Sequence, residues 1–187
     1  MTPGCALTFP HSWQAEILAE RPMILPPRHF TYPRDAEEVE RGALEVMVRP
    51  GAGAPFLGTF ALGFADPAAP SGVWSCPNPD EVCAVAGGYA YVVNTRDPEA
   101  FTQAEFRPVL EVRPLAAHKL LLFAGNSALL AWGREGRAWR TERLSSEGLR
   151  IETIDGGELR GFGWDLMTDR EVPFTIDLRT GQRIGGI

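Results

Sequence analysis

The chain has 187 residues, of which 44% are hydrophobic and 22% are charged, as in an ordinary globular protein. Its formal net charge of −6 argues against a nucleic-acid backbone as the main partner, because neutralising phosphates requires clustered cations. No apolar stretch approaches the ~18 residues of a membrane-spanning helix, and the N-terminus lacks the pattern of a signal peptide. We therefore expect a cytoplasmic protein that binds neither nucleic acid nor membranes.

Residues 1–41 differ from the remainder and predict a short, mostly irregular N-terminal extension that packs on a sheet. One helix is predicted over Trp13–Glu20, with Ser12 as its N-cap. The proline-rich stretch 23–33 favours an extended conformation over a sheet edge, because proline suppresses helix and lacks an amide hydrogen. The charged stretch Arg34–Arg41 is compatible with a short helix or a loop.

Residues 42–187 predict a single antiparallel β domain. A hairpin is expected first, with strands at 44–49 and 56–65 around a turn rich in glycine and proline. The second half of the chain repeats short apolar runs separated by Gly or Asp turns, which is typical of an all-β protein. The strands predicted there are Val82–Asn94, Lys119–Phe123, Ser127–Trp132, Trp139–Leu144, Leu149–Ile154, Leu159–Trp164 and Val172–Leu178.

Two stretches of this half, Ala128–Trp139 and Phe174–Arg183, share the order strand, glycine turn, strand. The second contains Asp-Leu-Arg-Thr-Gly at 177–181, and here the chain resembles blades of quinoprotein-like β-propellers, in which an Asp-Leu-x-Thr-Gly turn joins two strands. The resemblance implies sheets arranged as propeller blades. This length allows about four blades at most, so a closed ring would also need the N-terminal residues. A sandwich or a partly open barrel fits the same pattern. No cofactor is implied, because hairpin turns do not hold the ligands of a quinone.

The most distinctive local motif is the pair Cys76 and Cys83, which are separated by six residues. This spacing is unusual for zinc, for which only Cys5 and three histidines remain as further ligands. We favour unpaired thiols, with Cys83 buried on a strand and Cys76 in the preceding loop; a disulfide and a metal site are the alternatives. No Gly-x-Ser-x-Gly motif is present, and we predict no catalytic residue, metal or cofactor.

An acidic loop, 164–172, is the predicted ligand site. It places Asp165, Asp169 and Glu171 close to Trp164 in the sequence. Carboxylates beside an aromatic ring can bind a sugar or a cation, and paired carboxylates hydrolyse glycosides. Turns also favour acidic residues for purely local reasons. A small enzyme or carbohydrate-binding protein that uses these four residues is our second hypothesis.

Our first hypothesis is a non-catalytic module that binds another protein. The five tryptophans are many for this length, and tryptophan and arginine anchor protein interfaces. Trp139 lies between Arg137 and Arg140, on a predicted strand with charges on both faces, and these three residues are the predicted partner surface. Homo-oligomerisation is a third hypothesis, because a short array of blades would expose sheet edges.

Overall fold

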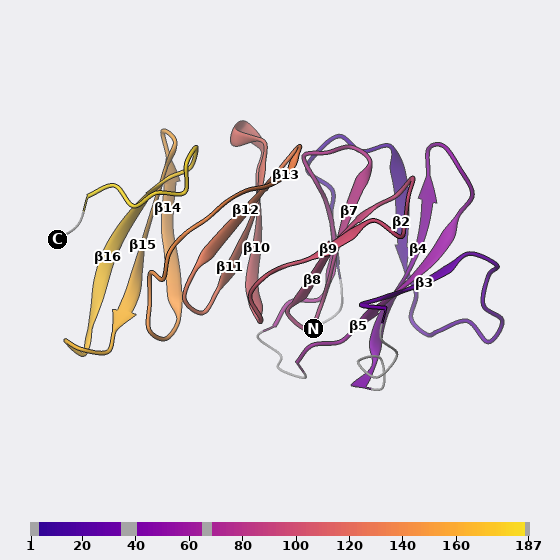
Figure 1. The fold of residues 1–187 in the computed structure, drawn as a ribbon, viewed down its shortest axis with the longest axis horizontal. Coiled ribbons are helices and arrows are strands. Elements are labelled where there is room, and N and C mark those ends of the chain that lie inside the picture. The colour runs from indigo at the N-terminus through magenta and orange to yellow at the C-terminus, as the bar shows by residue number, and fades with distance from the viewer. Residues whose placement is uncertain (1–3, 35–40, 65–68, 186–187) are drawn as a thin grey trace. The chain divides into compact units, whose positions relative to one another are not determined.

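The computed structural model describes residues 4–34, 41–64 and 69–185 (Figure 1). The chain divides into two compact units, Met1–Val109 and Leu110–Ile187. The regular elements of the described residues are β-strands, apart from short 3₁₀ turns such as η2 (Ala116–His118), which confirms the predicted all-β class. None of the helical segments in these ranges is long and apolar enough to cross a membrane.

Two sheets build the described part of the first unit. One sheet has the order β2-β4-β5-β3 and consists of β2 (Trp13–Ile17), β4 (Ala43–Pro50), β5 (Phe56–Ala61) and β3 (His29–Tyr32). The other has the order β1-β6-β7-β8-β9 and consists of β1 (Gly4–Ala6), β6 (Gly72–Ser75), β7 (Glu81–Ala86), β8 (Tyr89–Asn94) and β9 (Phe101–Gln103). The strands β1 and β3 pair in parallel with their neighbours, and the other pairs are antiparallel.

The core of the first unit lies between these two sheets. Leu44, Val46 and Val48 alternate along β4 and point to it, as expected for a strand with one face buried. They pack in one cluster with side chains of β7 and β8, including Val82 and Tyr91. The alternation that predicted the first hairpin therefore reflects a real buried face.

The helix predicted over Trp13–Glu20 is wrong. Residues Trp13–Ile17 form β2, which pairs antiparallel with β4, and Ile17 lies opposite Val46. Trp13 is buried and Ile17 is half-buried, whereas Gln14 and Glu16, which alternate with them, are exposed. A period of two, not a helical face, thus buries the apolar side chains.

The predicted boundary at residue 41 falls inside the first unit, and residues 35–40 lie outside the described residues.

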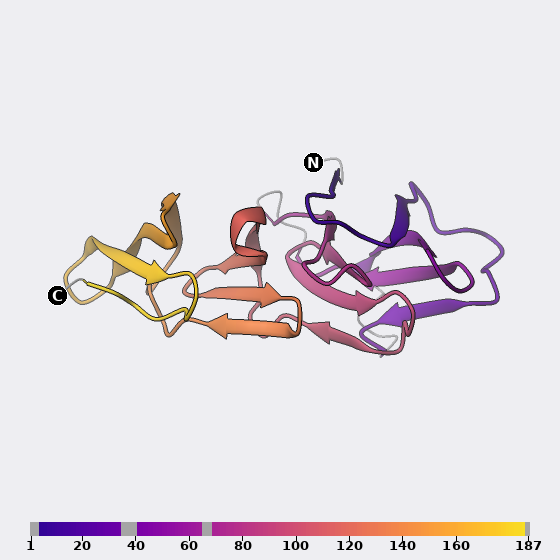
Figure 2. The same cartoon turned by 90° about the horizontal axis from the view of Figure 1, so that it is seen from above.

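The described part of the second unit also has two sheets, each a meander of sequence neighbours. The first comprises β10 (Val109–Leu115), β11 (Leu120–Gly125), β12 (Leu129–Gly133) and β13 (Gly136–Arg140), and the second β14 (Leu149–Asp155), β15 (Glu158–Asp165) and β16 (Arg170–Asp177). Strands β11, β12 and β13 run side by side in both views (Figure 1, Figure 2). A four-stranded meander is also the strand order of a propeller blade.

The core of the second unit joins its two sheets. Leu122 and Leu129 from the first sheet pack in one cluster with Leu159, Phe174 and Ile176 from the second. Beyond β16 the chain turns back, and Ile184 N–H donates to the carbonyl of Thr175 at 2.8 Å. The residues after the turn therefore extend the second sheet by a short fourth segment.

Candidate functional site

The predicted ligand residues all lie on the β15–β16 hairpin. Trp164 is directly opposite Glu171 in the antiparallel register, and Asp165 is opposite Arg170 at the last pair before the turn. Trp164 and Asp165 are half-buried, whereas Asp169 and Glu171 are exposed. The hairpin thus brings the four residues to one end of the second sheet.

The carboxylates of this hairpin are engaged in local interactions. Asp165 accepts the amide hydrogen of Met167 and the hydroxyl hydrogen of Thr168, each at 2.9 Å, and these bonds hold the pKa of Asp165 below its usual value. Glu171 lies 3.6 Å from the guanidinium of Arg150 on β14. Within the described residues no three His, Cys, Asp or Glu side chains gather as a metal-binding group would. The acids therefore shape the turn and its neighbouring strands.

The tip of the same turn presents two apolar side chains to solvent, Leu166 at 62% and Met167 at 92% exposure. The turn is nevertheless tied to the preceding segment, because Ser146 N–H donates to the carbonyl of Trp164 at 2.7 Å. Together with the bonds to Asp165, this contact fixes the backbone below the tip. The turn therefore holds exposed apolar groups in a defined position.

Beside the tip lies a pocket of about 290 Å³, which we call the turn pocket. Ser145 helps to build its wall, since its hydroxyl accepts the amide hydrogen of Trp164 at 2.8 Å. The wall also approaches Gly163 so closely that a methyl group there would clash with the carbonyl of Leu144. The turn pocket is lined by Arg143, Leu144, Ser145, Ser146, Gly163, Trp164, Asp165, Val172 and Arg183.

A second depression, of about 580 Å³, shares Arg143, Leu144 and Arg183 with the turn pocket and adds Arg140 and Gln182 to its lining; we call it the arginine groove. Arg143 donates to the carbonyls of residues 145 and 146 at 2.9 and 3.0 Å. Arg183 donates to the carbonyl of residue 173 at 2.9 Å. Each guanidinium has five N–H donors, so these bonds leave further donors for a ligand.

Of the predicted partner residues, Arg137 and Arg140 are exposed, and Arg140 lines the arginine groove. Trp139 is buried at 7% exposure, and its indole N–H donates to the carbonyl of Leu178 at 2.7 Å. Its ring also lies against Gly181, where an added methyl carbon would come within 2.7 Å of it. The position of Trp139 leaves little of its surface for a partner to contact.

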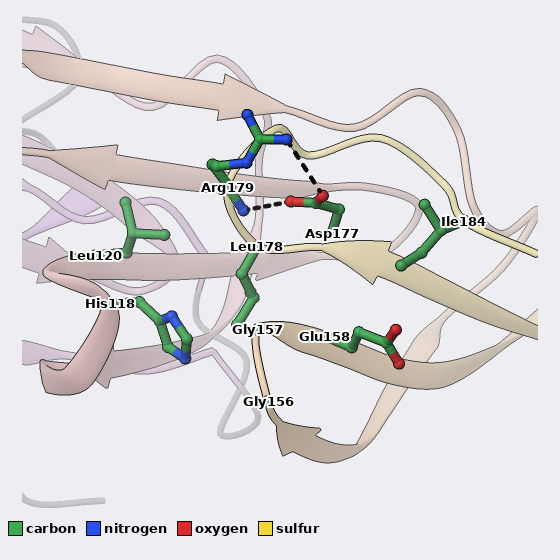
Figure 3. A pocket seen from close by; sticks show the side chains of 9 residues that line it. All are labelled: His118, Leu120, Gly156, Gly157, Glu158, Asp177, Leu178, Arg179 and Ile184. Atoms are coloured by element: carbon green, nitrogen blue, oxygen red, sulfur yellow. Dashed lines mark hydrogen bonds and ion pairs between the residues drawn. The ribbon is translucent and has the colours of Figure 1, made fainter.

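The opposite end of the second sheet contains another pocket, of about 570 Å³ (Figure 3). The carboxylate of Asp177 accepts the amide hydrogens of Arg179 and residue 180 at 2.7 and 3.1 Å, so it too serves a turn. His118 faces this pocket from η2, and Glu158 from the start of β15 (Figure 3). Sequence reasoning missed this pocket, because its lining comes from four separate segments.

The three cysteines carry free thiols, with Cys76 and Cys83 buried and Cys5 exposed. Burial raises the pKa of the Cys76 and Cys83 thiols well above their ordinary value. A neutral, buried thiol is a poor nucleophile and a poor metal ligand. The Cys76–Cys83 segment therefore contributes to packing in the first unit.

The chain matches no model of a known protein family, and no curated protein matches it. Among solved structures it is similar to the crystal structure of the N-terminal domain of Nup159, with a TM-score of 0.38 and 12% sequence identity. The similarity covers all of this chain and 54% of that one, so the chain spans about half the length of that structure. At this TM-score we transfer neither fold nor function from it.

Proposed function

We propose that the chain is a non-catalytic protein-binding module that contacts its partner through Leu166 and Met167 at the tip of the β15–β16 turn. The exposure of both side chains on a hydrogen-bonded turn carries this proposal. Burying apolar surface in a partner is favourable by about 25 cal/mol per Å². A turn that is already ordered loses little conformational entropy on binding, so more of this energy appears as affinity.

The arginine groove supplies the polar part of the proposed interface. Its charged lining residues are Arg140, Arg143, Arg183 and Glu142, so this surface is locally positive although the whole chain is net negative. Complementary charges around an apolar anchor increase specificity and the rate of association. The partner is therefore a protein with an apolar pocket for the tip and acidic side chains beside it.

A carbohydrate-binding protein or small enzyme is the second candidate, and one observation favours it. Trp164 and Asp165 line the turn pocket together, so a ring and a carboxylate face the same cavity. Both oxygens of Asp165 already accept hydrogen bonds from the turn, which limits what this carboxylate offers a sugar. Protein binding through the tip is therefore the better supported function.

The test compares partner capture by the immobilised full-length protein and two double variants. Leu166→Ser with Met167→Ser removes the apolar tip, and Met23→Ser with Ile24→Ser removes another exposed apolar pair, which lies in the first unit. Neither change touches a core side chain, so both variants should keep the stability of the wild type within about 0.5 kcal/mol. Proteins captured from the source lysate are quantified by mass spectrometry.

A stoichiometric partner that is lost at least about tenfold by the tip variant and kept by the control variant supports the proposal. Equal capture by all three proteins would show that the tip is not the contact. If no protein is captured, the second candidate gains support from a ligand-induced rise in melting temperature that Asp165→Asn abolishes. A mass that rises with concentration would instead indicate homo-oligomerisation.

A further inference from the structure

Within the part of the chain that the structure describes, the edge strand of the first unit has a row of unpaired backbone groups. Strand β3 is the last strand of the sheet β2-β4-β5-β3 and pairs in parallel with β5. Leu57 N–H donates to the carbonyl of Arg28 at 3.0 Å, and this bond shows which residues of the strand direct their backbone groups toward β5. In a parallel ladder, alternate residues bond to one neighbour, so the N–H and C=O groups of His29 and Thr31 point away from β5. Among the described residues nothing pairs with these four groups.

A groove of about 340 Å³, which we call the β3 groove, runs along this edge. All four residues of β3 line it, together with Arg34, Pro98 and Glu99. Successive side chains of a strand point to opposite faces of its sheet. A cavity that touches all four must therefore follow the free edge of the strand rather than one of its faces.

The far wall of the β3 groove is held in place before any ligand binds. The hydroxyl of Tyr32 donates to the carbonyl of Pro98 at 2.8 Å, and its ring stacks on Phe60 at a centroid distance of 4.8 Å. The side-chain oxygen of Asn94 accepts two amide hydrogens of the following turn, at 2.9 and 3.2 Å. At the end of the groove, Arg34 donates to the carbonyl of Glu99 at 3.2 Å.

The strand itself is fixed on both faces. On one face the ring of His29 contacts the hydroxyl of Thr59 at 2.9 Å, and Thr59 donates to the buried Glu45 at 2.6 Å. On the other face Phe30 meets Phe56 edge to face at 5.6 Å. Both the edge and the wall are thus preorganised, which lowers the entropic cost of adding a strand.

The charges around the β3 groove define its occupant. Arg28, immediately before β3, donates to the carbonyl of Ala54 and lies over the ring of Phe30, and it has no acidic partner among the described residues. The charge of Arg34 is balanced by Glu99 at 3.6 Å. The edge is therefore locally positive at the end where the chain enters the strand.

We propose that the β3 groove binds an extended, acidic peptide segment of a partner protein as an added β-strand. The backbone of the peptide pairs with His29 and Thr31, and a carboxylate at one end reaches Arg28. Strand addition of this kind draws affinity from main-chain hydrogen bonds and specificity from neighbouring side chains. This site lies in the first unit and is independent of the turn proposed above.

The test uses a displayed library of short random peptides, selected against the full-length protein and measured by fluorescence polarisation. Thr31→Pro removes an outward amide hydrogen without affecting the ladder to β5, and Thr31→Val keeps that hydrogen and replaces the hydroxyl with a methyl group. We expect acidic peptides that bind the wild type and the valine variant equally and the proline variant at least about tenfold more weakly. Arg28→Ala should weaken the same peptides.

A second measurement does not depend on the folding of the proline variant. Methylating alternate backbone nitrogens of a selected peptide should abolish binding in one register and leave it unchanged in the other. Failure to select any peptide would overturn the proposal, as would equal binding by the proline variant or insensitivity to methylation in both registers. A homodimer that the proline variant dissociates would also overturn it, because the edge would then be occupied by a second copy.

Discussion

Replacing Trp139 tests whether this residue stabilises the second unit or serves a partner surface. Its indole lies on Gly181 and its N–H donates to the carbonyl of Leu178, so it links β13 to the residues that follow β16. Trp139→Phe removes the donor and part of the ring, and Trp139→Ala removes the whole ring. Arg137→Gln, at an exposed position of the same strand, is the control.

The magnitudes follow from burial and from the lost hydrogen bond. Leu178 is buried, so Trp139→Phe leaves a buried carbonyl without its donor, at a cost of about 1–3 kcal/mol. Truncating a buried tryptophan to alanine costs about 3–5 kcal/mol, because a cavity remains in the core. The control should change the free energy of unfolding by no more than about 0.5 kcal/mol.

The assay is urea unfolding of the full-length protein, followed by far-UV circular dichroism so that loss of the tryptophan does not affect the signal. We expect the order of stability to be wild type and Arg137→Gln, then Trp139→Phe, then Trp139→Ala. If Trp139→Ala unfolds within about 0.5 kcal/mol of the wild type, the core assignment of Trp139 is refuted. Loss of partner binding at unchanged stability would then return Trp139 to the partner surface.

Three further predictions concern titratable groups. In the native protein at pH 8 a disulfide reagent should modify Cys5 only, and Cys76 and Cys83 should react only after unfolding; rapid modification of all three would contradict their burial. The hydrogen bonds that Asp165 accepts lower its pKa. Their contribution to the free energy of unfolding is therefore present above pH 3.8 and is lost as the pH falls through the native pKa. An NMR titration of the Met167 amide should have its midpoint below 3.8. Burial is the main cause that lowers the pKa of His29, and the charge of Arg21 is the second. The free energy of unfolding should therefore have its full value above pH 6.5 and decrease as the pH falls below it, because only the unfolded chain then takes up the proton. A titration midpoint of the His29 ring at or above 6.5 would contradict this environment.

Alternation along a strand was the reliable signal in this sequence. Phe174 and Ile176 are buried in β16 while their neighbours are not, and this strand was predicted to within two residues at each end. The single strand predicted over Val82–Asn94 is two strands, β7 and β8, joined at Gly87 and Gly88, which both have positive φ. Both strands are buried along nearly their whole length, so neither shows alternation and the apolar run looks continuous.

The connection after β13 could not be predicted from local pattern. Of the strand predicted at Trp139–Leu144, only the first two residues belong to a strand, because β13 ends at Arg140. There the hydroxyl of Thr141 accepts the amide hydrogen of Leu129 at 3.0 Å, and the chain then leaves the sheet. A side-chain bond to a residue twelve positions earlier has no signature in a short sequence window.

The predicted ligand site and the proposed contact lie in the same loop, but the sequence-based prediction emphasised the acids of that loop. Leu166 and Met167 lie between the acidic residues, and two apolar residues inside a polar turn are a signal that could have been read from the sequence. Arg143 and Arg183 could not have been assigned to the same groove, because they are distant in the chain and meet only through the packing of the second unit.

The hydrogen bonds that join Glu45, Thr59 and His29 each have a defined donor and acceptor. A threonine hydroxyl has one hydrogen, and Thr59 gives it to Glu45, so the hydrogen between Thr59 and the ring must come from Nε2 of His29. The neutral ring is therefore the Nε2–H tautomer, and its Nδ1 is left as an acceptor. Glu45→Gln would offer Thr59 either a carbonyl acceptor or an amide donor, so the direction of both bonds and the position of the ring hydrogen would no longer be fixed. The buried carboxylate of Glu45 thus determines the tautomer of His29, whose ring lines the edge of its sheet.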